Sequence, residues 1–139
     1  MAITHYKGSM LNLGVPSIRE LLISTIGASK FKHFQIGDKH FLVSLNIYDG
    51  TTNDLLSIIY EYDATHININ PFKQIQSIET KGAFDVESFN INNIVEGTVD
   101  YFMVVANERS GEDYIQQSII YKYDPNNSTD PFQTFQSIF

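Results

Sequence analysis

Two acidic residues in the second half of the chain are spaced as ligands of a metal ion could be. Asp85 and Glu87 stand two residues apart in a strand-like segment, and alternate residues of a β-strand point to the same face. Calcium takes oxygen ligands, so two carboxylates on one face could hold it. The alternative is a solvated or ion-paired strand edge, because Lys30 and Lys32 have the same spacing earlier in the chain. The charge reversal favours this alternative, and calcium is the one cofactor that the sequence suggests.

Histidine and cysteine give no further catalytic or metal site. The chain has no cysteine, which excludes disulfides, zinc–thiolate sites and thiol catalysis. His5, His33, His40 and His66 lack the spacing of metal ligands, although His33 and His40 could face each other across a Gly-Asp hairpin. A nucleophile elbow, a phosphate-binding glycine loop and a metalloprotease motif are all absent. We therefore predict a protein that is not an enzyme.

Four tyrosines recur in two matching pairs. Tyr60 and Tyr62 belong to one hydrophobic segment, and Tyr121 and Tyr123 belong to another. Exposed rings of this kind could form a platform for an aromatic or carbohydrate ligand. Aromatic side chains contribute strongly to buried interfaces, so in a chain with repeated segments we expect them to pack between units.

Charge and hydropathy limit the possible partners. Sixteen Asp and Glu oppose nine Lys and Arg, which gives the 139 residues a net charge of -7. An acidic chain without a basic cluster is poorly suited to phosphate backbones or anionic lipid. Apolar runs stay well short of the roughly 20 residues that cross a bilayer, and the N-terminal segment lacks the pattern of a signal peptide. We expect no binding to nucleic acid and no membrane insertion.

The chain contains an internal repeat. The segment SIIYEYD at Ser57–Asp63 returns as SIIYKYD at Ser118–Asp124, with a single substitution. Other matched residues are Gly27 with Gly82, Phe34 with Phe89, Asn46 with Asn107, Phe72 with Phe132, and Gln76 with Gln136. A period of roughly 55–60 residues with several strands per unit indicates a repeat architecture, in which neighbouring units cover each other's faces.

Runs rich in Ile, Val, Phe and Tyr, separated by Gly, Asn, Asp and Pro, predict the strands. In the first unit they are Ile18–Ser24, Phe31–Ile36, Lys39–Asn46 and Leu55–Tyr62, and in the second Phe72–Ile78, Val86–Asn92, Asp100–Asn107 and Ile115–Tyr123. Only the first of these segments could instead be a helix, because Ser17 and Glu20 form a weak capping box. Its register with the second unit favours a strand.

The repeat divides the chain into four segments. Residues 1–16 are expected to form a tail or a degenerate strand, 17–71 the first repeat, and 72–131 the second repeat. Residues 132–139 match the first strand of a third repeat that is not completed. An unpaired apolar strand promotes aggregation, so we expect this strand to pair with another chain.

The order of these motifs resembles the epitempin, or epilepsy-associated, repeat (EPTP/EAR). The second unit carries FKQIQSI, GAFDVESFNI, YFMVVAN and SIIYKYD, and the end of the chain carries PFQTFQSIF. GASKFKHFQI, FLVSLN and SIIYEYD in the first unit are more divergent. The resemblance implies an all-β fold in which each repeat is a four-stranded antiparallel blade of a β-propeller. Propellers need at least four blades, so this chain would be a partial one or be completed by oligomerisation.

The resemblance also implies an extracellular, non-catalytic module for protein–protein interaction. The residues expected to pack one blade on the next are Tyr60, Tyr62, Phe72, Gln76, Phe89, Asn107, Tyr121, Tyr123, Phe132 and Gln136. Two alternatives stay open. The chain could be a structural protein that closes a propeller by self-association, or a lectin-like protein that binds carbohydrate.

Overall fold

Within the part of the chain that the structure describes, the fold is built from β-strands, apart from one short 3₁₀ helix at Ala64–His66. A computed structural model describes residues 2–10, 17–67 and 70–139, and side chains from residue 23 onward within those ranges. The strands are β1 (Ala2–Met10), β2 (Ser17–Thr25), β3 (Ala28–Ile36), β4 (Lys39–Asn46), β5 (Asp54–Tyr62), β6 (Phe72–Lys81), β7 (Ala83–Asn93), β8 (Thr98–Asn107), β9 (Ser118–Tyr123) and β10 (Phe132–Ile138). The all-β prediction is confirmed, and β2 is a strand rather than a helix. Among the described residues, no helix is long and apolar enough to cross a membrane.

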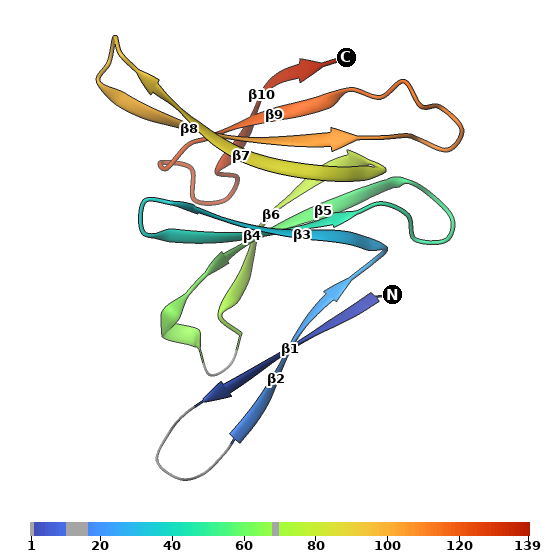
Figure 1. The fold of residues 1–139 in the computed structure, drawn as a ribbon, viewed down its shortest axis with the longest axis vertical. Helices are drawn as coiled ribbons and strands as arrows, with labels where there is room; N and C mark the ends of the chain where they lie inside the picture. The colour runs from blue at the N-terminus through green and yellow to red at the C-terminus, as the bar shows by residue number, and fades with distance from the viewer. Residues whose placement is uncertain (1, 11–16, 68–69) are drawn as a thin grey trace.

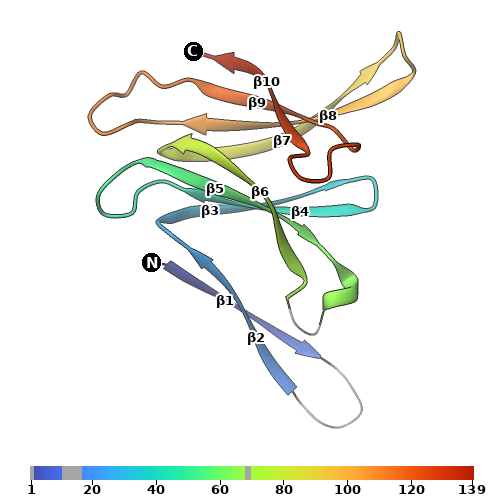
Figure 2. The ribbon, with the colours of Figure 1, turned by 180° about the vertical axis from the view of Figure 1, so that it is seen from behind.

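Two four-stranded antiparallel sheets lie face to face (Figure 1, Figure 2). The first sheet has the order β3-β4-β5-β6 and the second sheet has the order β7-β8-β9-β10. β3 and β7 are therefore the corresponding edge strands of the two sheets, and β6 and β10 form the opposite edges. β1 and β2 pair with each other in a separate antiparallel hairpin (Figure 1).

Each sheet takes its fourth strand from the start of the following sequence unit. The loops before β6 and β10 fold back as hairpins, because the N–H of Asp63 donates to the carbonyl of Pro71 at 2.6 Å and the N–H of Asp124 to that of Pro131 at 2.7 Å. The chain crosses to the second sheet only at Gly82, the single residue between β6 and β7. The C-terminal strand, expected to lack a partner in its own chain, consequently pairs with β9.

The two sheets share one internal register, so the sequence repeat is also a structural repeat. Corresponding cross-strand pairs are Phe34–Phe41 and Phe89–Phe102, Val43–Ile59 and Val104–Ile120, and Ile59–Gln76 and Ile120–Gln136. Irregularities in pairing also fall at matching points, in the first and in the last strand pair of each sheet. Any position in one sheet can therefore be compared directly with its counterpart in the other.

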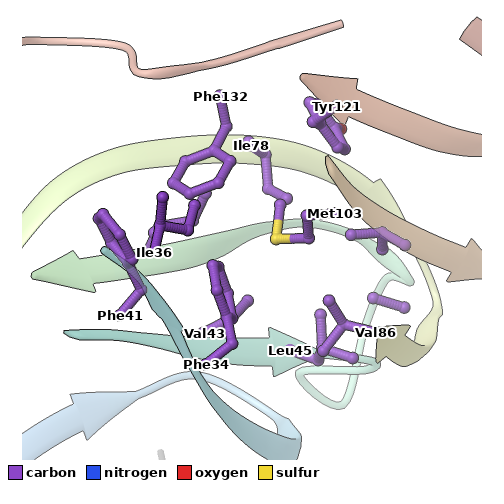
Figure 3. Close-up of a cluster of buried hydrophobic side chains, with 13 residues drawn as sticks. Phe34, Ile36, Phe41, Val43, Leu45, Ile78, Val86, Met103, Tyr121 and Phe132 are labelled. Atoms are coloured by element: carbon purple, nitrogen blue, oxygen red, sulfur yellow. The ribbon is translucent and has the colours of Figure 1, made fainter. Parts of the chain in front are cut away.

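The hydrophobic core lies between the two sheets (Figure 3). The first sheet contributes Phe34, Ile36, Phe41, Val43, Leu45, Ile59 and Ile78, and the second contributes Ala83, Val86, Met103, Val105, Tyr121 and Phe132. Apolar surface removed from water is the main favourable contribution to folding, and here it is removed by stacking one sheet on the other. Each sheet thus depends on its neighbour for a buried face.

Glycine is required where the chain turns from β2 into β3. Gly27 has φ 68°, and a Cβ there would lie 1.9 Å from the carbonyl oxygen of Tyr48. Gly37, in the β3–β4 hairpin, has φ 60° but open space around its Cβ position. We expect Gly37→Ala to cost about 1–2 kcal/mol of stability through the left-handed backbone. Gly27→Ala should cost roughly 3 kcal/mol or more, because a backbone clash is added. Urea unfolding of both variants tests this, and equal losses would contradict it.

Candidate functional site

Gln76 and Phe132, both expected in the packing set, meet across the two sheets. Gln76 is buried, and its Nε2 donates to the carbonyl oxygen of Phe132 at 2.7 Å. In return, the backbone N–H of Phe132 donates to Oε1 of Gln76 at 2.9 Å. Buried backbone groups need such partners, and one amide side chain satisfies both at the start of β10. These two hydrogen bonds tie the outer strand of the first sheet to that of the second.

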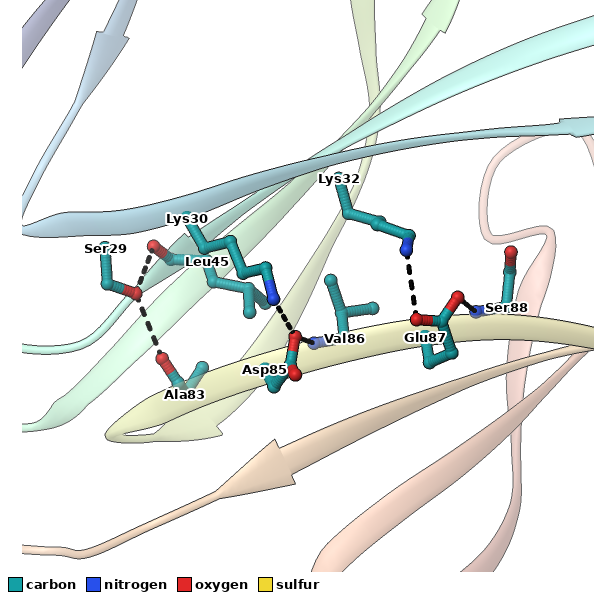
Figure 4. A network of polar contacts seen from close by, with 9 residues as sticks. All are labelled: Ser29, Lys30, Lys32, Leu45, Ala83, Asp85, Val86, Glu87 and Ser88. Atoms are coloured by element: carbon teal, nitrogen blue, oxygen red, sulfur yellow. Dashed lines mark hydrogen bonds and ion pairs between the residues drawn. The ribbon is translucent and has the colours of Figure 1, made fainter.

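Asn107, another predicted packing residue, connects the sheets near the β6–β7 crossing. Its Oδ1 accepts a hydrogen bond from the N–H of Lys81 at 3.0 Å, while its Nδ2 donates to the carbonyl of Gln117 at 2.8 Å. On the facing strand, the hydroxyl of Ser29 donates to the carbonyl of Ala83 at 3.2 Å (Figure 4). Polar contacts therefore fix the relative placement of two sheets whose association is mainly apolar.

The four tyrosines lie on two different faces. Tyr121 and Tyr123 point into the space between the sheets, where Tyr121 belongs to the core and Tyr123 packs against it. Tyr60 and Tyr62 lie on the other face of the first sheet, where Tyr62 packs against Phe72 with ring centroids 5.4 Å apart. The four rings therefore do not form one continuous platform.

Asp85 and Glu87 lie on β7 and contact lysines of β3 (Figure 4). Lys30 Nζ is paired with the carboxylate of Asp85, and Lys32 Nζ lies 3.0 Å from Oε2 of Glu87. Hydrogen bonds from these lysines are the main reason that the pKa of each carboxyl is lowered. Within the described residues, no group of three or more His, Asp or Glu side chains could hold a metal ion. A calcium site at this pair of acids stays a prediction, whereas the ion pairs are present.

The histidines are placed apart from these contacts. His33 and His40 face each other across the β3–β4 hairpin, with Nε2 of the first 3.0 Å from Nδ1 of the second and the rings stacked. His66 lies in the 3₁₀ helix, and its Nδ1 is 2.9 Å from the carboxylate of Asp63. His5 is part of β1, and its side chain lies outside the described residues. His33 and His40 therefore contact each other at the surface, and His66 contacts Asp63 within a turn.

The face of the second sheet that points away from the first sheet carries a row of aromatic rings. Phe102 stacks on Phe89 with ring centroids 5.3 Å apart, and Phe135 packs edge-on against Phe102 at 5.2 Å. Together with Ile91, Ile120, Gln136 and Ile138, these residues form what we call the outward face. It spans all four strands β7–β10.

The outward face repeats a surface that is buried in the first sheet. Matched positions have exposed fractions of 7% for Phe34 and 38% for Phe89, 9% for Ile36 and 53% for Ile91, and 4% for Ile78 and 40% for Ile138. The residue type is the same in each pair, and only the covering sheet differs. The packing residues predicted from the sequence include Phe89 and Gln136 but not Phe135 or Ile138, although Ile138 matches Ile78 in the repeat. The sequence repeat could have identified them, because it relates each of these residues to a first-sheet position, but only once the buried face of the first sheet was known.

Ion pairing at β7 predicts sensitivity to acid. A carboxyl whose pKa is lower in the folded than in the unfolded state stabilises the fold above its unfolded pKa, and this contribution is lost as the pH falls through the folded pKa. Since the pKa values of Asp85 and Glu87 are lowered, the free energy of unfolding should decrease below about pH 5. Lys30→Met/Lys32→Met should flatten this decrease in urea titrations at low salt, and an unchanged pH profile would contradict the prediction.

Comparison with known proteins relates the sequence to a family of repeat proteins. Residues 72–124 match the model of the EPTP domain. The chain is 33% identical over 116 residues to the human thrombospondin-type laminin G domain and EAR repeat-containing protein, and 32% identical to the mouse protein of the same name. Each match covers 84% of this chain but only 16% of the relative, so the chain spans about a sixth of the length of these curated relatives. No solved structure matches significantly. The chain belongs to the EPTP/EAR repeat family.

Proposed function

We propose that the chain is a non-catalytic protein-interaction module of β-propeller type, and that its outward face binds another β-sheet of the same family. One observation carries this proposal. The outward face has the residues and the register of the first-sheet face that is buried against the second sheet. A surface that is core in one repeat is therefore open in the next.

Burial of this face would be favourable for the same reason that the existing core is. Apolar patches of this kind on an otherwise soluble protein commonly mark interaction sites, and each buried Phe or Ile side chain contributes about 1.5–3 kcal/mol. Gln136 corresponds to Gln76, so its amide is placed to hold the backbone of an incoming outer strand. Both polar and apolar parts of the observed interface thus recur on the outward face.

A propeller is a ring of stacked sheets, and the way that the first sheet leads into the second could be continued by further sheets. The single-residue crossing at Gly82 leads directly from the outer strand of one sheet to the edge strand of the next. Because a propeller closes with at least four blades, further sheets would come from the same polypeptide or from other chains. The second candidate function is a structural one, in which several copies of this chain associate and close a propeller. The exposed outward face supports this candidate equally.

Light scattering on a sizing column tests the proposal. The mass of the wild-type particle should rise above the 15.8 kDa of one chain as its concentration increases. Phe135→Glu should remain monomeric at every concentration, since it places a charge on the outward face where the wild-type ring is 57% exposed. Ile94→Glu is the matched control, because Ile94 is 93% exposed and lies in the loop between β7 and β8, outside the residues of the outward face. Association that Phe135→Glu leaves unchanged, or no association at all, would contradict the proposal.

A further inference from the structure

We infer that Asp85 and Glu87 determine which sheet the outward face accepts, and that the preferred partner is an EAR-type sheet with lysines at the positions of Lys30 and Lys32. This inference rests on the proposed function, because it concerns the partner of the same face. It assigns a role in partner selection to two acids that already form ion pairs between the two sheets of this chain.

The observed interface shows which positions meet when two such sheets stack. Lys30 and Lys32 occupy the positions in β3 that Asp85 and Glu87 occupy in β7, one residue after the same irregularity in pairing. These equivalent positions form the ion pairs between the sheets (Figure 4). A third sheet stacked with the same geometry would place its own equivalent residues opposite the two acids.

The two acids are also accessible from the outward side. Glu87 pairs with Val104 in the strand register and lies on the same side of β7 as Phe89, which belongs to the outward face. The side chains of Asp85 and Glu87 keep 50% and 63% of their surface exposed despite their lysine partners. A carboxylate has several lone pairs and can accept hydrogen bonds from more than one ammonium group. Each acid can therefore interact with lysines on both sides.

A second pair of positions shows the same reversal of charge. Lys39 and Glu61 form an ion pair of 3.0 Å in the first sheet, and their counterparts Asp100 and Lys122 form one of 2.9 Å in the second sheet. The second sheet is thus a charge-reversed copy of the first at four matched positions. An alternating stack, in which a sheet of the first kind follows one of the second kind, avoids like charges at the β7 edge.

The alternative partner is a sheet that itself carries acids at these positions. Stacked on the outward face, it would bring four carboxylates together at the edge, where the lysine-bearing sheet would form two ion pairs. Exposed ion pairs are individually weak, so two of them should give a preference of roughly 2- to 30-fold for the lysine-bearing sheet. The apolar face provides most of the affinity, and the two acids provide the selectivity.

An extended chain tests this selectivity. The full chain is followed by a second copy of residues 25–81, which keeps the repeat in register because Phe139 corresponds to the residue before Thr25. The matched variant carries Lys30→Asp/Lys32→Glu in the added copy only. Docking is measured by the protection of Ile138→Cys, on the outward face, from a thiol reagent, in a chain that has no other cysteine.

The lysine-bearing extension should protect the thiol roughly 2- to 30-fold more than the acidic extension at low salt. The difference should largely disappear near 1 M salt, where the screening length is about 3 Å. Equal protection by both extensions at low salt would overturn the inference and leave the proposed function intact. If neither extension protects the thiol, the proposed function fails as well.

Discussion

Phe132→Ala is expected to lower the free energy of unfolding by about 3–5 kcal/mol, the usual cost of removing a buried phenylalanine ring. Phe132 is 2% exposed, and its ring packs edge-on against Phe34 and Phe41 with centroid distances of 5.8 and 5.3 Å. It also contacts Tyr123 at 5.3 Å. Since it contacts rings from both sheets, its loss leaves a cavity in the core, which the surrounding strands can fill only by moving closer together.

The matched control for this prediction is on the same strand. Phe135 points to the outward face, where it contacts Phe102 and is more than half exposed. Phe135→Ala should cost no more than about 1.5 kcal/mol, the range of a single aromatic contact. Urea unfolding followed by far-ultraviolet circular dichroism measures both variants. Similar losses would mean that the core is not centred between the sheets.

Gln76→Ala should also have a large effect, with an expected loss of about 2–5 kcal/mol in the free energy of unfolding. The substitution removes one side chain but leaves two backbone groups of Phe132, its N–H and its carbonyl, without a hydrogen-bond partner. Each buried polar group left without a partner costs about 1–3 kcal/mol, which exceeds the net value of the hydrogen bond itself. The stability of the inter-sheet contact therefore depends strongly on this buried amide.

Gln136→Ala is the control for Gln76→Ala, because it changes the same residue type at the matched position of the second sheet. Gln136 is exposed, so this variant should unfold within about 0.5 kcal/mol of wild type. Comparison of the two urea midpoints tests the prediction. A loss for Gln136→Ala as large as for Gln76→Ala would show that the glutamine acts within its own sheet rather than between sheets.

The strands could be predicted from the sequence because the signals for them are local. Alternation of Ile and Tyr in SIIYEYD and SIIYKYD identifies the strands, and the repeat confirms their order. The contact of lysines with Asp85 and Glu87 could also be anticipated, since equal spacing and opposite charge mark positions that can meet. These inferences need no knowledge of which strands share a sheet.

Sheet membership could not be predicted in the same way. A sequence repeat has the same period wherever its boundary is drawn, so it does not show whether β6 closes one sheet or opens the next. The choice is made by short-range backbone contacts, such as the hydrogen bond from Asp63 to Pro71, and by the crossing at Gly82. For the same reason, Gln76 and Phe132 were both recognised as packing residues but not as partners.

The outward face was missed because exposure depends on the neighbouring sheet and not on the residue. Phe34 and Phe89 are identical in type and in register, yet the first is buried and the second is exposed. A hydrophobic pattern predicts which residues avoid water, but it does not show which of two equivalent faces is already covered. That distinction, on which the proposed function depends, comes from the stacking of the sheets.

The rate of thiol modification at Ile138→Cys tests the central claim most directly. Two controls, Ile78→Cys at the buried matched position and Ile94→Cys at the exposed hairpin tip, should react slowly and rapidly, respectively, at every protein concentration. If the outward face is an interaction surface, Ile138→Cys should react rapidly in dilute solution and more slowly as the concentration rises. A rate for Ile138→Cys that matches Ile94→Cys at all concentrations would contradict the account.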